Sequence, residues 1–126
     1  MNTYSYVDDQ VVASTPLNPA GGITSDDRVV PLADLFRLLG DPTRLRIVLA
    51  CVAERRAVGA IAEGLGLSGS LVSHHLRLLR AARIVRAERQ GKQVFYVAAD
   101  RHISGMLGEL LEHIAEPQPQ DATDID

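Results

Sequence analysis

The chain has 126 residues, enough for one compact domain, and its composition excludes several classes of protein. No apolar run approaches the roughly 20 residues that a membrane-spanning helix needs. The N-terminus has no basic segment followed by an apolar stretch, so no secretory signal is expected. The single cysteine, Cys51, cannot form an internal disulfide framework. We therefore expect a cytoplasmic protein with no membrane attachment.

The net charge of −3 conceals an uneven distribution along the chain. Residues 41–98 contain ten basic and four acidic residues, which gives this segment a net charge of +6. The acidic ends compensate, with −3 over residues 1–28 and −6 over residues 100–126. A basic middle segment is what a surface that binds nucleic-acid phosphates requires.

The pattern of apolar residues predicts a folded domain over residues 29–116, between flexible tails at 1–28 and 117–126. Helical spacing runs from Val30 to Leu39 and stops at Gly40, a typical C-terminal cap. A second, largely buried helix follows, with Asp41 as its N-cap and Pro42 in its first turn.

The middle of the chain predicts a helix-turn-helix followed by a hairpin. A short helix over 58–65 ends at Gly66, and Ser68 is a suitable N-cap for a helix that runs to about residue 82. Two β-leaning runs, 84–89 and 93–97, flank a Gln-Gly-Lys turn and indicate a wing. A last helix has a narrow apolar stripe that suggests a partner chain. The expected fold is mainly α with a β-hairpin wing, a winged helix-turn-helix that dimerises through its terminal helices.

The helix after Ser68 has a polar face suited to reading DNA, opposite an apolar face that includes Leu71 and Leu78. Short hydroxyl side chains allow close approach to bases, and arginines can bind phosphates or guanine. Basic residues of the wing can reach the flanking backbone. An ordinary solvated helix face is the alternative. His75 projects onto the apolar side and is interpreted as a histidine at the edge of the core. The candidate DNA-binding residues are Ser68, Ser70, Ser73, His74, Arg77, Arg80, Arg89 and Lys92.

Four residues of the last helix, Asp100, His102, His113 and Glu116, form a reasonable tetrahedral ligand set for Zn(II) or Co(II). His102 and His113 are eleven residues apart, so they share a helix face but lie roughly 16 Å apart along the axis. One helix cannot bind one ion with both of them. An antiparallel partner helix would bring Asp100 and His102 of one chain beside His113 and Glu116 of the other, so the pattern predicts a homodimer with two equivalent sites. The alternative is an acidic solvated face with incidental histidines.

Several stretches of the sequence resemble the ArsR/SmtB family of metal-responsive repressors, and the similarity covers about residues 30–117. The matching stretches are Leu39-Gly40-Asp41-Pro42-Thr43-Arg44-Leu45-Arg46-Ile47, Val72-Ser73-His74-His75-Leu76-Arg77, Arg89-Gln90-Gly91-Lys92 and the terminal ligand pattern. The last of these is similar to the zinc-sensing subgroup.

The resemblance implies a repressor that binds a palindromic operator when metal-free and dissociates when metal occupies Asp100, His102, His113 and Glu116. It also implies a link between liganded His113 and a backbone carbonyl near Arg83. Relatives with thiolate ligands place cysteines near residues 55–60, where this chain has none. Cys51 lies in an apolar run and is interpreted as a buried thiol.

Two other classes of function remain to be compared. A winged-helix regulator that responds to nickel, or to no metal, would share the DNA-binding face. A zinc hydrolase would need an open coordination position and a general base. With four protein ligands and no catalytic constellation, no enzyme activity is expected.

Overall fold

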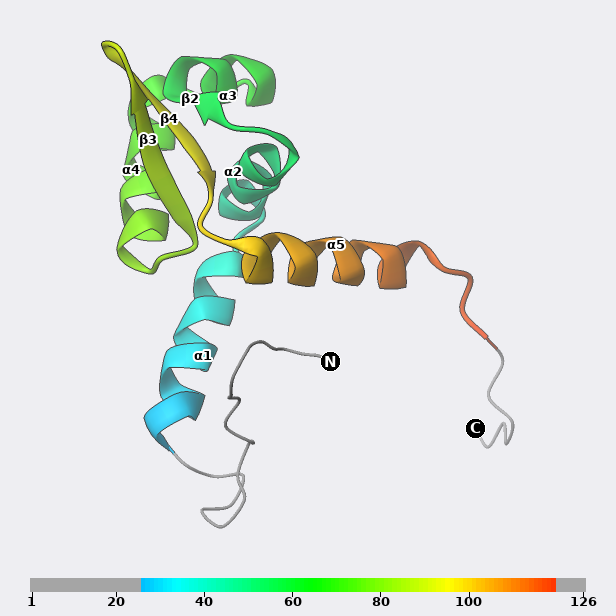
Figure 1. Cartoon of the computed structure of the whole chain (residues 1–126). Helices are drawn as coiled ribbons and strands as arrows, with labels where there is room; N and C mark the ends of the chain where they lie inside the picture. Colours follow the sequence, from blue (N-terminus) through cyan, green and yellow to red (C-terminus); the bar gives the residue numbers. More distant parts are fainter. Residues whose placement is uncertain (1–25, 120–126) are drawn as a thin grey trace. The chain divides into compact units, whose positions relative to one another are not determined.

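The computed structural model describes residues 26–119 and shows the predicted winged helix-turn-helix (Figure 1). The chain divides between Arg37 and Leu38 into two units, and α1 lies mostly in the first of them. The elements are α1 (Asp26–Leu39), α2 (Pro42–Ala53), β2 (Arg56–Ala57), α3 (Val58–Leu65), α4 (Gly69–Ala81), β3 (Val85–Gln90), β4 (Gln93–Ala98) and α5 (Arg101–Ala115). No helix among residues 26–119 is long and apolar enough to cross a membrane.

Helix α1 runs from Asp26 to Leu39. Asp27, in the first turn, suits the positive end of the helix dipole, and the helix continues through Pro31. Four large apolar side chains of α1 are about half exposed. They are Val29, Val30, Leu32 and Phe36.

The core of the second unit lies between α2, α3, α4 and the start of β3. Helix α2 is capped as predicted: the Asp41 side chain accepts a hydrogen bond from the backbone N–H of Arg44 at 2.9 Å, and Pro42 opens the helix. The largest fully buried side chains include Ile47, Val48, Ile61, Val72, Leu76, Leu79, Ile84 and Val85. Side chains three or four residues apart lie on the same face of a helix, so each helix contributes one apolar stripe to this core.

Cys51 of α2 is fully buried, as predicted. Desolvation raises the pKa of its thiol to about 11, against a smaller opposite effect of the Arg56 charge. The thiol is therefore protonated near neutral pH and is a poor nucleophile and a poor metal ligand.

The wing is the hairpin of β3 and β4, whose loop has two residues. It belongs to a three-stranded antiparallel sheet of order β2-β4-β3. Gln90 pairs with Gln93. The two loop residues are Gly91 and Lys92, and only Gly91 has a positive φ, of 63°, which is the pattern of a type II′ turn.

Strand β2 was not predicted, because its two residues, paired with Phe95 and Tyr96, are too few to form a pattern.

The predicted turn between α3 and α4 depends on Gly66, which has a φ of 70°. Its N–H donates to the carbonyl of Glu63 at 3.3 Å, and the next N–H, of Leu67, donates to Ala62 at 2.9 Å. This is the bonding of a Schellman motif, in which a left-handed residue ends the helix. Ser68 then caps α4, because its Oγ accepts from the N–H of Leu71 at 3.1 Å.

Helix α4 ends in the same motif, but with an arginine in the left-handed position. Arg83 has a φ of 61°, its N–H donates to Arg80 at 3.0 Å, and the N–H of Ile84 donates to Leu79 at 2.9 Å. A side chain other than glycine is strained in this conformation. We expect Arg83→Gly to raise the free energy of unfolding by about 1 kcal/mol, measured by urea denaturation. Gly66→Ala is the matched test in the opposite direction and should lower it; equal effects of the two changes would contradict this account.

His75 is nine-tenths buried on α4, as its position on the apolar side predicted, and its Nδ1 has no hydrogen-bond partner within residues 26–119. Burial lowers the pKa of the ring, with the nearby Arg44 charge in the same direction, Asp41 opposing and His74 adding a smaller lowering effect. The folded state therefore resists protonation that the unfolded chain accepts below about pH 6.5. The contribution of the unprotonated His75 ring to the free energy of unfolding should be fully present above that pH. It should be lost progressively as the pH falls toward the lowered pKa. Thermal melts from pH 7 to 5 should show the loss, and His75→Leu should reduce it. His74→Leu, at an exposed position, removes only the smallest of these effects and should leave most of the loss in place.

Candidate DNA interface and metal centre

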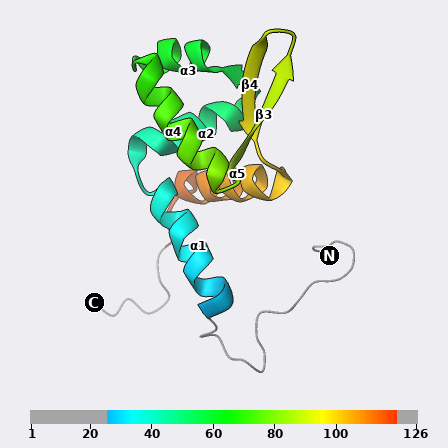
Figure 2. The same cartoon turned by 90° about the vertical axis from the view of Figure 1, so that its left-hand side faces the viewer.

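The wing tip, α3 and the start of α4 lie at one end of the second unit. Figures 1 and 2, which differ by a quarter turn, both show this arrangement, with α5 at the opposite end. The first turn of α4 and the Gly91-Lys92 loop can therefore approach the same ligand. Arg80 is in the last turn of α4 and Arg83 follows the end of the helix, so both are at the opposite end of α4 from its first turn.

Most of the candidate DNA-binding side chains are exposed. These are Ser68, Ser70, His74, Arg77, Arg80, Arg89 and Lys92. Ser73 is half-buried, and the Oγ of Ser68 already accepts a hydrogen bond as the helix cap. Capping uses a lone pair of the hydroxyl and leaves its one proton, so Ser68 can still donate a hydrogen bond to a phosphate oxygen.

Two leucines of α4 lie differently from their predicted place on the buried face. Leu71 is 39% exposed and Leu78 is 37% exposed, whereas Val72, Leu76 and Leu79 are buried. Leu71 and Leu78 are seven residues apart and border the polar face, because the buried stripe of α4 is narrower than the helical wheel suggested. The exposed face of α4 is therefore less polar than predicted.

The structure separates the basic residues of the middle segment into two groups. Arg44 donates to the carbonyl of Leu38, and Arg56 donates to Ala50, both at 2.9 Å, so these two hold helix ends. Two more arginines, Arg55 and Arg86, form ion pairs with the Glu88 carboxylate. Within the described part of the chain, no ion pair or hydrogen bond holds the side chains of Arg46, Arg77, Arg80, Arg83, Arg89 and Lys92. Arg46 and Arg83 were not among the candidates, and nothing in the local sequence separates them from the structural arginines.

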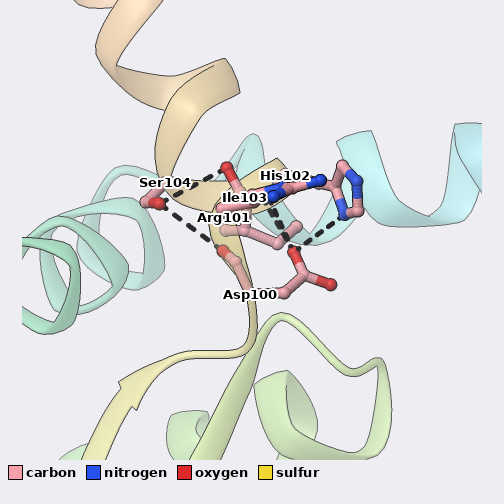
Figure 3. A network of polar contacts seen from close by, with 5 residues as sticks. All are labelled: Asp100, Arg101, His102, Ile103 and Ser104. Atoms are coloured by element: carbon pink, nitrogen blue, oxygen red, sulfur yellow. Dashed lines mark hydrogen bonds and ion pairs between the residues drawn. The ribbon is translucent and has the colours of Figure 1, made fainter. Parts of the chain in front are cut away.

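The first half of the predicted ligand set, Asp100 and His102, lies at the start of α5 (Figure 3). Asp100 is the N-cap, and its Oδ1 accepts from the N–H of His102 at 2.9 Å and of Ile103 at 3.1 Å. The same oxygen lies 3.5 Å from Nδ1 of His102. Because Asp100 is in the capping position, its carboxylate lies beside the imidazole of His102, two residues later. Both side chains are exposed, and Oδ2 of Asp100 makes no hydrogen bond or ion pair with residues 26–119.

The second half lies at the other end of the helix. His113 is in the last turn of α5 and Glu116 is its C-cap. Both line one open cavity of about 400 Å³, with Ile114 and residues 117–119. The spacing of three residues places the two donors on neighbouring positions of one face.

The two pairs do not meet in one chain. His102 and His113 are separated by roughly 16 Å of helix rise, and no group of three or more potential ligands forms among residues 26–119. Glu109 occupies the same face, seven residues after His102 and four before His113. The spacing could have identified it as part of the strip. A four-ligand site therefore requires a second chain.

The apolar stripe of α5 divides into a buried and an exposed part. Ile103 and Leu107 are buried at 9% and 6% exposure, whereas Leu110, Leu111 and Ile114 are 45%, 49% and 76% exposed. Figure 1 shows the second half of α5 extending away from the sheet and from α2–α4. These large apolar side chains lie next to the second ligand pair and are left exposed by the described residues, 26–119.

Comparison with known sequences places these features in a family. A helix-turn-helix domain model matches residues 39–88. The chain is 36% identical over 94 residues to the transcriptional repressor SmtB homolog of Synechocystis sp., which covers 75% of this chain and 71% of the relative. It is 43% identical over 90 residues to the transcriptional regulator CmtR of Mycobacterium tuberculosis, covering 71% of this chain and 76% of that one. These relatives are DNA-binding regulators and not enzymes.

Solved structures give the same result. The structure of CmtR from M. tuberculosis, described as a cadmium metal-sensor, has a TM-score of 0.58 and 41% identity, covering 72% of this chain and 98% of that one. A homodimeric winged helix-turn-helix domain from Mycobacterium bovis, a possible ArsR-family regulator, has a TM-score of 0.60 and 25% identity, covering 79% and 100%. The chain belongs to the ArsR/SmtB family of winged helix-turn-helix transcriptional regulators, which includes metal-sensing repressors.

Proposed function

We propose that this protein is a homodimeric, cytoplasmic repressor that binds a palindromic operator when metal-free and dissociates on binding Zn(II), with Co(II) as the alternative metal. The observation that carries the proposal is the division of four metal-binding side chains into two pairs at opposite ends of α5. Antiparallel pairing of two α5 helices would complete two equivalent sites, each with Asp100 and His102 from one protomer and His113 and Glu116 from the other.

The donor set supports zinc. Two imidazoles and two carboxylates suit a tetrahedral, borderline-soft divalent ion, and such a site, with four protein ligands, is closed to substrate. All four side chains are exposed in the single chain, so no buried charge has to be desolvated before a partner arrives. Oδ2 of Asp100 is available to a metal while Oδ1 caps the helix.

The comparison with the cadmium sensor CmtR does not extend to a thiolate site. Cadmium is a soft ion that favours thiolates, and this chain contains one cysteine. Cys51 is fully buried in α2 and its pKa is about 11, so it offers no thiolate near neutral pH. The family membership therefore supports metal sensing, whereas the donor chemistry of this chain supports Zn(II) or Co(II).

The exposed apolar side chains of α1 and of the second half of α5 support the homodimer. Each protomer would present the start of α4 and the wing tip to one half-site, with basic side chains that form no ion pair with the acidic residues of the described segment. Ser68, Ser70, Ser73, His74, Arg77 and Arg80 are proposed to face the major groove and its phosphates, and Arg89 and Lys92 the flanking backbone. Metal held between the α5 helices would favour a dimer geometry that no longer fits two half-sites.

The family resemblance suggests that liganded His113 donates its second ring nitrogen to a carbonyl near Arg83, at the end of α4. Such a bond would orient the ligand and tie the metal centre to the recognition helix. Coupling of this kind is reciprocal, so operator DNA must weaken zinc binding by the factor by which zinc weakens DNA binding.

The test is operator binding by fluorescence anisotropy with zinc, cobalt, nickel, cadmium or chelator present, using a duplex selected by the metal-free protein from a random pool. Zinc or cobalt should release the duplex, and His102→Ala should prevent the release. Release by nickel alone, or by no metal, would overturn the proposed effector while leaving DNA binding intact. Zinc affinities that are equal for free and DNA-bound protein would overturn the coupling.

A further inference from the structure

One side chain joins the wing to the segment that leads into the helix-turn-helix. Arg55 lies between α2 and β2, and its guanidinium contacts three residues of the hairpin. It lies over the ring of Phe95 in β4, 4.6 Å from the ring centroid, and its Nη2 donates to Oε1 of Gln90 in β3. Its Nη1 is 3.5 Å from Oε1 of Glu88. Because the cation meets both strands, one contact fixes the hairpin as a whole.

The location of Arg55 gives this contact a mechanical consequence. The next two residues form β2 and pair with Tyr96 and Phe95 of β4, and α3 begins directly afterwards at Val58. The wing and the first helix of the helix-turn-helix are therefore connected through residues 55–57. Strand β2 is held to β4 by only two residue pairs. The side chain of Arg55, which reaches as far as β3, therefore adds resistance to rotation of the hairpin.

The charges around Glu88 fit a structural contact rather than a free phosphate-binding arginine. Arg86 holds Oε2 of Glu88 at 2.6 Å from the same strand, while Arg55 approaches Oε1 from outside the hairpin. The one carboxylate of the wing is thereby neutralised by two cations. Arg89 and Lys92, nearer the tip, make no hydrogen bond or ion pair within residues 26–119 and remain available to DNA.

We propose that Arg55 is a positioning residue that holds the wing at a fixed angle to the helix-turn-helix, so that the wing tip and α4 engage one duplex together. Pre-organisation of two contact elements strengthens binding because less freedom is lost on association. The proposal concerns DNA binding by the metal-free protein and does not depend on the metal site.

The test compares variants of the full-length protein in chelator by anisotropy, using the duplex selected by the wild-type protein. Arg55→Ala should weaken binding about tenfold, the scale of a contact element that is no longer held in place. Arg86→Ala is the matched control, because it removes the same charge and a contact to Glu88 but leaves the contacts of Arg55 with Phe95 and Gln90 in place; it should change affinity less than about twofold. Arg55→Lys keeps the charge but loses the planar fork and should not restore binding.

Three further measurements separate positioning from a direct phosphate contact. For positioning, Phe95→Leu should weaken binding, and adding it to Arg55→Ala should have no further effect. Amide exchange of the hairpin should accelerate in Arg55→Ala and not in Arg86→Ala. The slope of log affinity against log salt should stay unchanged. A slope reduced by about one, full rescue by Arg55→Lys, or no effect of Phe95→Leu would overturn the proposal.

Discussion

Replacing His113 by alanine is expected to leave operator binding by the metal-free protein unchanged and to abolish its release by zinc. His113 lies in the last turn of α5, exposed and far from the wing tip, so its loss removes a metal donor without disturbing the DNA-binding end. Losing one of four ligands should lower zinc affinity by at least about 100-fold, since removing mere outer-shell partners already costs 10- to 100-fold. Competition against a chromophoric chelator measures the affinity, and anisotropy measures the release.

The matched control for this variant is Glu112→Gln, next to His113 on α5. It removes one charge from the same turn, but the side chain lies off the strip of ligands by helical spacing. Glu116→Gln removes the same charge from a ligand and should behave like His113→Ala. If His113→Ala still released DNA at wild-type zinc concentrations, or if Glu112→Gln and Glu116→Gln were equivalent, the ligand assignment would be wrong.

Introducing a charge into the exposed stripe of α5 should have the largest effect on DNA binding. Ile114 is 76% exposed in the single chain and lies next to two half-exposed leucines, Leu110 and Leu111. An Ile114→Glu change would place an unpaired carboxylate in the proposed dimer contact, and such a charge is strongly unfavourable when buried. We expect a monomer by sedimentation velocity and an operator affinity at least about 100-fold weaker, because each chain then binds one half-site alone.

Gly105→Glu is the control for this change, because it adds the same charge at an exposed position on the side of α5 opposite the apolar stripe. It should remain dimeric and bind the operator normally. The folded state of both variants can be checked by far-ultraviolet circular dichroism. A dimeric Ile114→Glu protein, or one that binds the operator at wild-type affinity, would show that the second half of α5 is not the dimer contact.

Local signals explain why so much of the fold could be predicted. Asp41, Ser68 and Asp100 are cap residues whose bonds are made within three residues of each, and Gly66 and Gly91 supply the positive φ angles that their turns need. Features that depend on distant contacts were missed. Strand β2 exists only through its pairing with residues 95 and 96, and the exposure of Leu71 and Leu78 depends on the width of the core around α4.

The candidate site shows the same division. The spacing of the donors on α5, and the need for two chains to combine them, follow from helix geometry alone, and Asp100 lies beside His102 as the N-cap of the helix. The role of Arg55 could not be predicted, because its bond to Gln90 spans 35 positions of the sequence. Likewise, Arg83 in a left-handed conformation has no local signal, since glycine is the usual residue there.

The central claim is that each metal site combines ligands from two protomers, and subunit mixing tests it directly. His102→Ala and His113→Ala should each bind Co(II) weakly and lack the absorption of a four-coordinate site. In a heterodimer of the two, one site contains both lesions and the other contains neither. The mixture, after subunit exchange, should therefore regain one tight, four-coordinate site per heterodimer. Absence of any recovery would contradict the account, because sites built within one chain would stay damaged in every combination.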